Sequence, residues 1–203
     1  CLSRGLGDVY KRQTLYLIRH GQTLFNKKHQ IQGASDSPLT ELGKQQAAKA
    51  KLYFDQLNLT DYALFSSTQE RASDTLEILF PDEPYTRLKG IKEWNYGLFE
   101  GESELLNPPH PNGVVDLGAF FAAYGGETVE EVQTRTVKTL HQVVKETPHQ
   151  NVVAASHGDI LFLFAHHCLP VEAVKQIKIT NCCILKFEYE DETFTFVEAI
   201  HPA

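Results

Sequence analysis

Two histidine-glycine pairs follow short apolar runs in this sequence. Arg19, His20 and Gly21 come directly after LYLI, and His157 with Gly158 comes after VVAAS. In open α/β sheets, ligands bind at the carboxyl ends of the strands, where neighbouring strand ends meet. An imidazole there can act as a nucleophile, and an adjacent arginine can bind phosphate oxygens through its planar fork of donors. The shared position of the two pairs therefore predicts one crevice that holds both histidines, with glycines that allow a sharp turn and leave room for a ligand.

Arg71 is a further candidate for an anion site. The spacing of Ser67 and Glu70 predicts a capping box, which places Arg71 in the first turn of a helix, where the helix N-terminus adds partial positive charge. Alone, Arg71 is better explained as a solvated helix arginine or as an ion pair with Asp74. Each histidine alone would also more often be structural, so the combination carries the prediction.

The elements that must position these residues follow from the hydrophobic pattern. From Thr14 onward, short apolar runs alternate with helical periods, which is typical of a largely parallel sheet with crossover helices. The turn residues Asp191 and Glu192 indicate an antiparallel hairpin at one edge. The predicted fold is α/β with a mostly parallel central sheet and an antiparallel edge strand. Its strands are expected at 15–18, 62–66, 85–88, 152–156, 182–189 and 193–199.

Four helices are predicted from hydrophobic stripes. Thr40 is the expected N-cap of the first, and the second contains Arg71. Thr128 and Glu131 predict a capping box for the third, and residues 160–167 form the fourth. The proline- and glycine-rich stretch at 95–126 is expected to be a loop, with one short helix at 117–124.

Length and composition indicate one globular domain. The chain has 203 residues, of which 42% are hydrophobic and 22% charged. A formal net charge of −7 disfavours nucleic acid and anionic lipid as partners, and no apolar run approaches the roughly 20 residues of a membrane-spanning helix. We expect a cytoplasmic protein, because no spaced disulfide framework is evident among Cys1, Cys168, Cys182 and Cys183.

The N-terminal residues differ from the rest. The segment SRGLGDVYKRQ shows no helical or strand periodicity and resembles a translated sequencing adapter. We interpret residues 1–13 as an adapter-derived or disordered tail, with a natural flexible tail as the alternative. The sequence contains no methionine, so we also expect the native start to be missing. The single domain is expected to cover residues 14–203.

Four segments in this order, LYLIRHGQTLFN, SSTQERASDT, KEWNYGLFEG and SHGD, resemble the histidine phosphatase superfamily, which includes cofactor-dependent phosphoglycerate mutases. The resemblance covers Thr14 to about Ala199. It implies a three-layer α/β/α sandwich and a phosphohistidine intermediate, with no metal and no other cofactor.

The resemblance also implies roles for individual residues. His20 would be the nucleophile, and Glu93 the general acid that protonates the leaving oxygen and then the base that activates water. Arg19, Arg71 and His157 would form the phosphate pocket, where fixed cationic donors stabilise the charge on the transferring group. A carboxyl group among arginines normally has a lowered pKa, so Glu93 needs burial or a nearby phosphate to raise it.

Three more positions match the family less closely. Asn26 and Gln32 align with residues near the phosphate, although turn structure explains Gln32 equally well. Asp159 stands where the mutases commonly carry asparagine, and puts a negative charge at the pocket edge unless it caps the next helix. Glu100 and Glu102 are the rival candidates for the proton donor. Without further evidence, each of them is better explained as a surface carboxylate in a loop.

The choice between hydrolase and mutase depends on the segment after Glu93. A mutase substrate carries a second anionic group, yet no lysine or arginine occurs between Lys92 and Arg135. The prediction is therefore a phosphomonoester hydrolase acting on a small-molecule phosphate ester, with a phosphoglycerate mutase or a non-catalytic phosphate-binding module as alternatives. Four aromatic residues of this segment either form an apolar lid over the site or only pack the loop: Phe99, Phe120, Phe121 and Tyr124.

Overall fold

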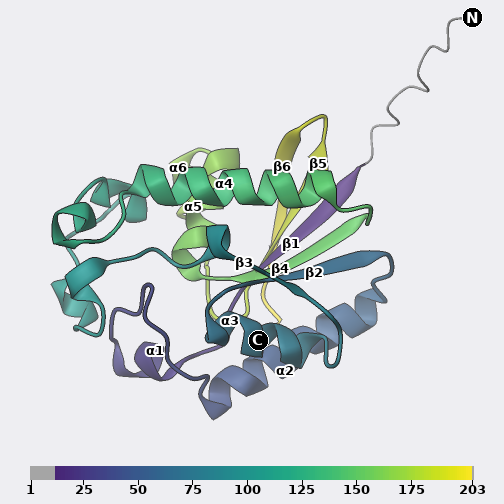
Figure 1. The fold of residues 1–203 in the computed structure, drawn as a ribbon, viewed down its shortest axis with the longest axis horizontal. Coiled ribbons are helices and arrows are strands. Elements are labelled where there is room, and N and C mark those ends of the chain that lie inside the picture. The colour runs from purple at the N-terminus through teal and green to yellow at the C-terminus, as the bar shows by residue number, and fades with distance from the viewer. Residues whose placement is uncertain (1–11, 203) are drawn as a thin grey trace, which may run out of the picture.

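The computed structural model describes residues 12–202 and contains one six-stranded sheet with helices on both faces (Figure 1). The order across the sheet is β3-β2-β4-β1-β5-β6. The predicted α/β class and three-layer arrangement are confirmed. The strands are β1 (Gln13–Arg19), β2 (Tyr62–Ser67), β3 (Thr86–Leu88), β4 (Asn151–Ser156), β5 (Ile184–Glu190) and β6 (Thr193–Ile200).

The sheet is mostly parallel, as predicted. β1 and β2 both pair parallel with β4, and β3 pairs parallel with β2. β5 lies between β1 and the edge strand β6 and is antiparallel to both. β5 and β6 form the predicted hairpin. Asp191 and Glu192 in its turn both have positive φ, of 49° and 59°, as a two-residue turn between twisted strands requires.

Alternation along the central strands explains the two helical layers. In β1, Leu15 and Leu17 face one buried cluster, whereas Tyr16 and Ile18 face the other. α4 (Val129–Glu146) and α5 (Gly158–Cys168) cover the first face, and α2 (Glu41–Leu57) and α3 (Glu70–Leu79) cover the second (Figure 1). Two short helices complete the fold: α1 (Leu24–Lys28) and α6 (Val171–Val174).

The helix caps were predicted with one error. Thr40 caps α2 by accepting a hydrogen bond from the Gly43 backbone N–H, and Thr128 forms a complete capping box at α4. The capping box predicted at Ser67 is wrong. Gln69 is the N-cap of α3, and the Ser67 hydroxyl instead accepts from the Gln69 backbone N–H. Arg71 nevertheless lies in the first turn, as expected.

The segment after Glu93 has more local structure than expected. Four 3₁₀ turns follow one another along it, and aromatic side chains pack against each other. The ring centroids of Phe99 and Tyr124 are 4.9 Å apart, and those of Tyr96 and Phe121 are 4.8 Å apart. These contacts stabilise the loop from within. The turns are η2 (Gly97–Phe99), η3 (Glu104–Leu106), η4 (Val114–Leu117) and η5 (Phe121–Tyr124).

Strand β1 begins one residue before the expected start of the domain. Gln13 is the first residue of β1, is buried, and donates a hydrogen bond to the His149 carbonyl, so it belongs to the domain and not to the tail. The rest of the proposed tail, up to residue 11, lies outside the described residues. None of the helices within residues 12–202 is long and apolar enough to cross a membrane.

Candidate active site

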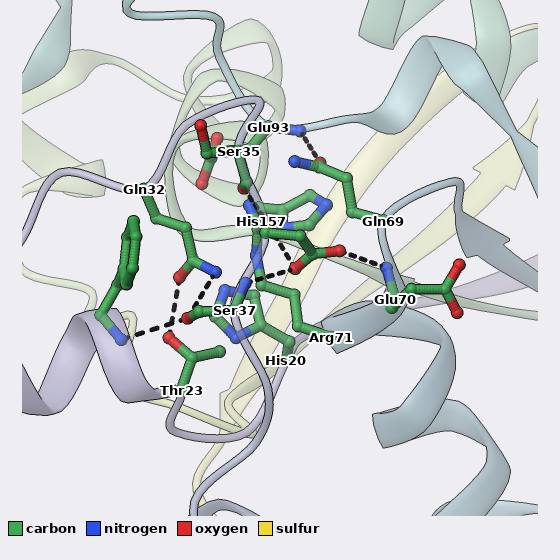
Figure 2. Close-up of polar contacts among 12 residues, drawn as sticks. His20, Thr23, Gln32, Ser35, Ser37, Gln69, Glu70, Arg71, Glu93 and His157 are labelled. Atoms are coloured by element: carbon green, nitrogen blue, oxygen red, sulfur yellow. Dashed lines mark hydrogen bonds and ion pairs between the residues drawn. The ribbon is translucent and has the colours of Figure 1, made fainter. Parts of the chain in front are cut away.

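The two histidine-glycine pairs meet because their strands are neighbours. In the parallel pairing of β1 with β4, Arg19 is opposite Ser156, and the residue that follows each strand is a histidine. The His20 backbone N–H donates to the Ser156 carbonyl at 3.0 Å. The ring centroids of His20 and His157 are 5.3 Å apart, and Arg71 lies beside both (Figure 2). The two histidines therefore lie side by side, as the strand ends predicted.

His20 is held as a neutral imidazole with one free nitrogen. Its Nδ1 lies 2.7 Å from the Gly21 carbonyl oxygen. Because a carbonyl can only accept, Nδ1 carries the proton and Nε2 keeps its lone pair. Burial lowers the pKa of His20 well below its usual value, and the nearby charges of Arg71 and Arg19 lower it further. A neutral imidazole with an available Nε2 is the form that can attack phosphorus.

The glycine after His20 is required for a close contact and not for a turn. Neither Gly21 nor Gly158 has a positive φ, so the expected sharp turn is not the reason for glycine at either position. A Cβ on Gly21 would lie 2.5 Å from the carbonyl oxygen of Gly43 in α2. A Cβ on Gly43 would lie 2.1 Å from the Gln22 carbonyl oxygen. Two glycines thus let the first turn of α2 touch the backbone beside His20.

Gly43→Ala is expected to lower the free energy of unfolding by about 1–3 kcal/mol, because the added methyl group must push two backbone segments apart. Urea denaturation measures the change. Gln45→Ala, on the exposed side of the same helix, is the matched control and should stay close to the parent value. Equal stability of the two variants would show that the contact is not tight in solution.

Arg71 is buried and is oriented by a loop. Its side chain donates to the carbonyls of Gly33 and Ser35 and to Oδ1 of Asp36, at 2.9, 2.9 and 3.0 Å. Its acidic partner is thus Asp36, and not Asp74 as the alternative interpretation proposed. Burial of this charge is costly unless it is paired, and Asp36 provides that pairing.

Three buried nitrogens among the described residues lack hydrogen-bond partners at this end of the sheet. They are Nε of Arg19, Nε of Arg71 and Nδ1 of His157. Buried polar atoms are nearly always hydrogen-bonded, so unpartnered ones indicate a missing partner. Both guanidinium groups carry hydrogen-bond donors and positive charge, which an anion would satisfy.

His157 differs from His20 in its surroundings. It is fully buried, and its Nε2 lies 2.8 Å from the Ser67 hydroxyl oxygen. Burial lowers the pKa of His157 well below its usual value, with further lowering by Arg71 and His20. His20, Arg19 and Arg71 line the cleft described below, whereas His157 is not among its lining residues.

Glu93 is a buried carboxyl group with a raised pKa. Burial is the main cause and the neighbouring Asp159 adds to it, whereas Arg71 opposes the shift, so the pKa rises to about 7. Its Oε1 accepts from the Trp94 backbone N–H, and its own backbone N–H donates to Gln69 (Figure 2). The condition set by the sequence, that burial outweighs the arginines, is met. A group with this pKa can hold and release a proton near neutral pH.

An ion pair behind Glu93 supports its backbone. Arg135 in α4 forms a bidentate pair with Glu127 and donates to the carbonyls of Gly90, Lys92 and Glu93. The Glu127 carboxylate in turn accepts from the Asn95 backbone N–H. Sequence reasoning missed this pair, because the residues that it connects are distant along the chain and no motif marks them.

The rival carboxylates have other surroundings. Glu100 accepts from the backbone N–H groups of Ala34, Ser35 and Tyr96, so both of its oxygens are used to join two loops. Glu102 is exposed and does not line the cleft. Of the three glutamates considered as proton donors, Glu93 is the one that is buried in the wall of the cleft.

Asn26 and Gln32 have structural contacts. Asn26 closes a capping box with Thr23 through its Oδ1, which leaves its side-chain nitrogen as a donor at the cleft. Gln32 accepts from the Thr23 hydroxyl and donates to the Ser37 hydroxyl (Figure 2). The turn interpretation of Gln32 thus has direct support, although Gln32 also lines the cleft.

The cleft has a volume of about 190 Å³ and extends from His20 toward η3 and η4. Its wall includes Asp159, which follows the N-cap His157 and so does not cap α5 itself. None of the four aromatic residues considered as a lid lines this cleft. They pack the loop instead, which decides between the two interpretations. No group of three or more metal-ligating side chains is found within residues 12–202.

The fold is that of an α/β protein in which two strand ends bring paired histidines and two arginines together beside one cleft. Comparison with protein families is consistent with this class, because the histidine phosphatase superfamily (branch 1) matches residues 15–200. The chain belongs to this superfamily.

The known relatives include both mutases and phosphatases. A protein of Shigella boydii named "Probable phosphoglycerate mutase GpmB" is 29% identical over 189 residues, which cover 87% of this chain and 85% of the relative. A phosphoglycerate mutase from Bacillus anthracis superposes with a TM-score of 0.81 at 24% identity, over 95% of this chain and 94% of that one. A phosphoserine phosphatase from Entamoeba histolytica superposes with a TM-score of 0.77 at 23% identity, over 94% of this chain and 98% of that one. These two structural likenesses concern the fold.

Proposed function

We propose that this chain is a phosphomonoester hydrolase that works without a metal ion through a phosphohistidine on His20. The observation that carries the proposal is the neutral His20 Nε2 beside two arginines that each keep an unpartnered buried nitrogen. A phosphate ester bound there would satisfy these donors and place phosphorus next to the nucleophile. In the first step the Nε2–P bond forms and the P–O bond to the alcohol breaks.

Glu93 would supply the proton that the departing alkoxide needs, since its pKa of about 7 leaves much of it protonated at neutral pH. The resulting carboxylate would then take a proton from water as the water oxygen attacks the phosphohistidine. That step returns His20 to its neutral form and releases phosphate. Arg19 and Arg71 would stabilise the charge on the equatorial oxygens throughout.

The test is hydrolysis of p-nitrophenyl phosphate by the purified protein with excess EDTA. We expect turnover to persist, because the proposed steps use only side chains. Loss of activity with EDTA, and its recovery with added divalent metal, would contradict the mechanism.

Three free thiols among the described residues are compatible with a reducing cytoplasmic location: Cys168, Cys182 and Cys183.

Phosphoglycerate mutase activity is the second candidate, because a curated relative at 29% identity carries that name. A coupled assay that follows conversion of 3-phosphoglycerate in the presence of 2,3-bisphosphoglycerate distinguishes the two. We expect hydrolysis to exceed isomerisation, since the segment from 93 to 134 supplies no lysine or arginine for a second anionic group. Faster isomerisation than hydrolysis would reverse this order.

A further inference from the structure

The charges that line the cleft are distributed unevenly. Among the described residues, the cleft is lined by two arginines, Arg19 and Arg71, and by no lysine. Both arginines lie at the His20 end. The remaining wall contains the carboxyl groups of Glu93, Asp159 and Glu104, together with the imidazole of His110. A bound phosphate ester would therefore place its phosphate among cations and its alcohol half among carboxyl groups.

Asp159 lies on the side of the leaving group. Its backbone N–H points to Oε2 of Glu93 at 3.4 Å, so the two residues are adjacent in the wall of the cleft. A proton donor must reach the oxygen that joins phosphorus to the alcohol. The residue next to that donor consequently faces the first atoms of the alcohol half.

Asp159 is the member of this pair that accepts a hydrogen bond from a hydroxyl group. The Tyr96 hydroxyl donates to Oδ2 of Asp159, and a hydrogen bond to a carboxylate stabilises its charged form. Burial raises the pKa of Asp159, whereas Tyr96 and Arg19 oppose that effect. Glu93 has no such hydroxyl donor in the described part of the chain, and burial and the nearby Asp159 raise its pKa to about 7.

Glu104 adds a second carboxylate at the outer end of the cleft. It begins η3, and 45% of its side chain is exposed. His29 is its nearby basic partner, at 3.4 Å. Since the loop from 93 to 134 has no lysine or arginine, nothing in that segment offsets the two carboxylates with a fixed positive charge.

This inference rests on the proposed function and specifies its substrate class. We propose that the enzyme selects phosphate esters of amino alcohols, with Asp159 as the specificity-determining residue that pairs with the ammonium group. An ester whose alcohol half carries a carboxylate or a second phosphate meets repulsion from Asp159 and Glu104 and is rejected.

Three esters of nearly equal size test this selectivity: ethanolamine phosphate, n-propyl phosphate and phosphoglycolate. Their alcohol halves are cationic, neutral and anionic. Calorimetry with the His20→Ala protein measures the dissociation constants without turnover. We expect ethanolamine phosphate to bind most tightly and phosphoglycolate at least about tenfold more weakly, because like charges brought together at a binding site oppose association. Phosphoglycolate binding as tightly as ethanolamine phosphate would overturn the inference.

Asp159→Asn in the same background keeps the side-chain shape and removes the charge. The ratio of the dissociation constant of phosphoglycolate to that of ethanolamine phosphate should then fall to within about threefold of unity. Glu104→Gln, at an exposed position that tolerates substitution, should reduce the ratio by a smaller factor. Glu102→Gln is the matched control, because this exposed carboxylate does not line the cleft, and it should leave the ratio unchanged. A ratio that Asp159→Asn leaves unchanged would refute the assignment, whatever the effect of Glu104→Gln.

Hydrolysis of n-propyl phosphate and p-nitrophenyl phosphate by the unmodified protein is measured separately. Absence of hydrolysis would contradict the proposed function, while the dissociation constants would still decide the selectivity. Equal dissociation constants with active hydrolysis would refute the selectivity and leave the phosphatase mechanism in place.

Discussion

His20→Ala is expected to lower turnover of p-nitrophenyl phosphate on the order of 10⁴-fold or more, because the variant lacks the imidazole proposed to form the covalent intermediate. The neutral ring of His20 with its proton on Nδ1 has no equivalent in an alanine protein. Rapid-quench experiments with a ³²P-labelled ester provide the direct measurement. The parent protein should accumulate an acid-labile, base-stable phosphoenzyme, and the variant should form none.

His201→Ala is the control for this experiment, since His201 is exposed and lies outside the cleft. It should retain full labelling and turnover. Labelling that persisted in His20→Ala would place the phosphoryl group on another residue and would remove the basis of the proposed mechanism.

Glu93→Gln should produce the second largest loss, and the size of the loss should depend on the leaving group. An alkoxide needs a proton as it departs, so hydrolysis of n-propyl phosphate should fall about 10²- to 10⁴-fold. The p-nitrophenolate ion is stable without a proton, so the first step with p-nitrophenyl phosphate should be much less affected. Burst-phase stopped-flow kinetics isolate that step. Equal losses with both esters would argue against proton donation by Glu93.

The same residue predicts the pH dependence. The Glu93 pKa is raised to about 7, and the donor is active only while protonated. For n-propyl phosphate, kcat/KM should therefore decline as the pH rises through about 7, and this limb should be absent in Glu93→Gln. Removing the Asp159 charge should move the limb toward lower pH, because that charge contributes to the raised pKa.

The fold was predictable because its signals are local. Buried strands such as β4 appear as short apolar runs. The starts of α2 and α4 are each marked by an N-cap threonine that bonds a backbone N–H three residues later. The capping box at Ser67 failed because Gln69, which sequence preferences do not favour as an N-cap, takes that position. The Ser67 hydroxyl lies instead 2.8 Å from His157 Nε2, a contact between residues ninety positions apart.

The arrangement of the site was predictable only in part. Strand ends and glycines suggested that His20 and His157 would meet, and they do. The partners that orient the cleft residues could not be predicted in this way, because they come from distant segments of the chain. Nothing local to Asp36 indicates its ion pair with Arg71, and nothing local to Tyr96 indicates its hydrogen bond to Asp159. The aromatic residues Phe99, Phe120, Phe121 and Tyr124 were left open between a lid and loop packing, and their mutual contacts show that they pack the loop.

The self-packed loop after Glu93 has a consequence for how this protein could diversify. Its rings, including Phe99 and Tyr124, contact one another, while His20 and the arginines are held by strand ends and other loops. Residues from the loop, such as Glu104, nevertheless form the outer wall of the cleft. Two contacts also join the loop to the site: Glu100 accepts from Ser35, whose carbonyl orients Arg71, and Tyr96 donates to Asp159. A different loop grafted between the same end points could therefore change the outer wall of the cleft only if it kept these two contacts.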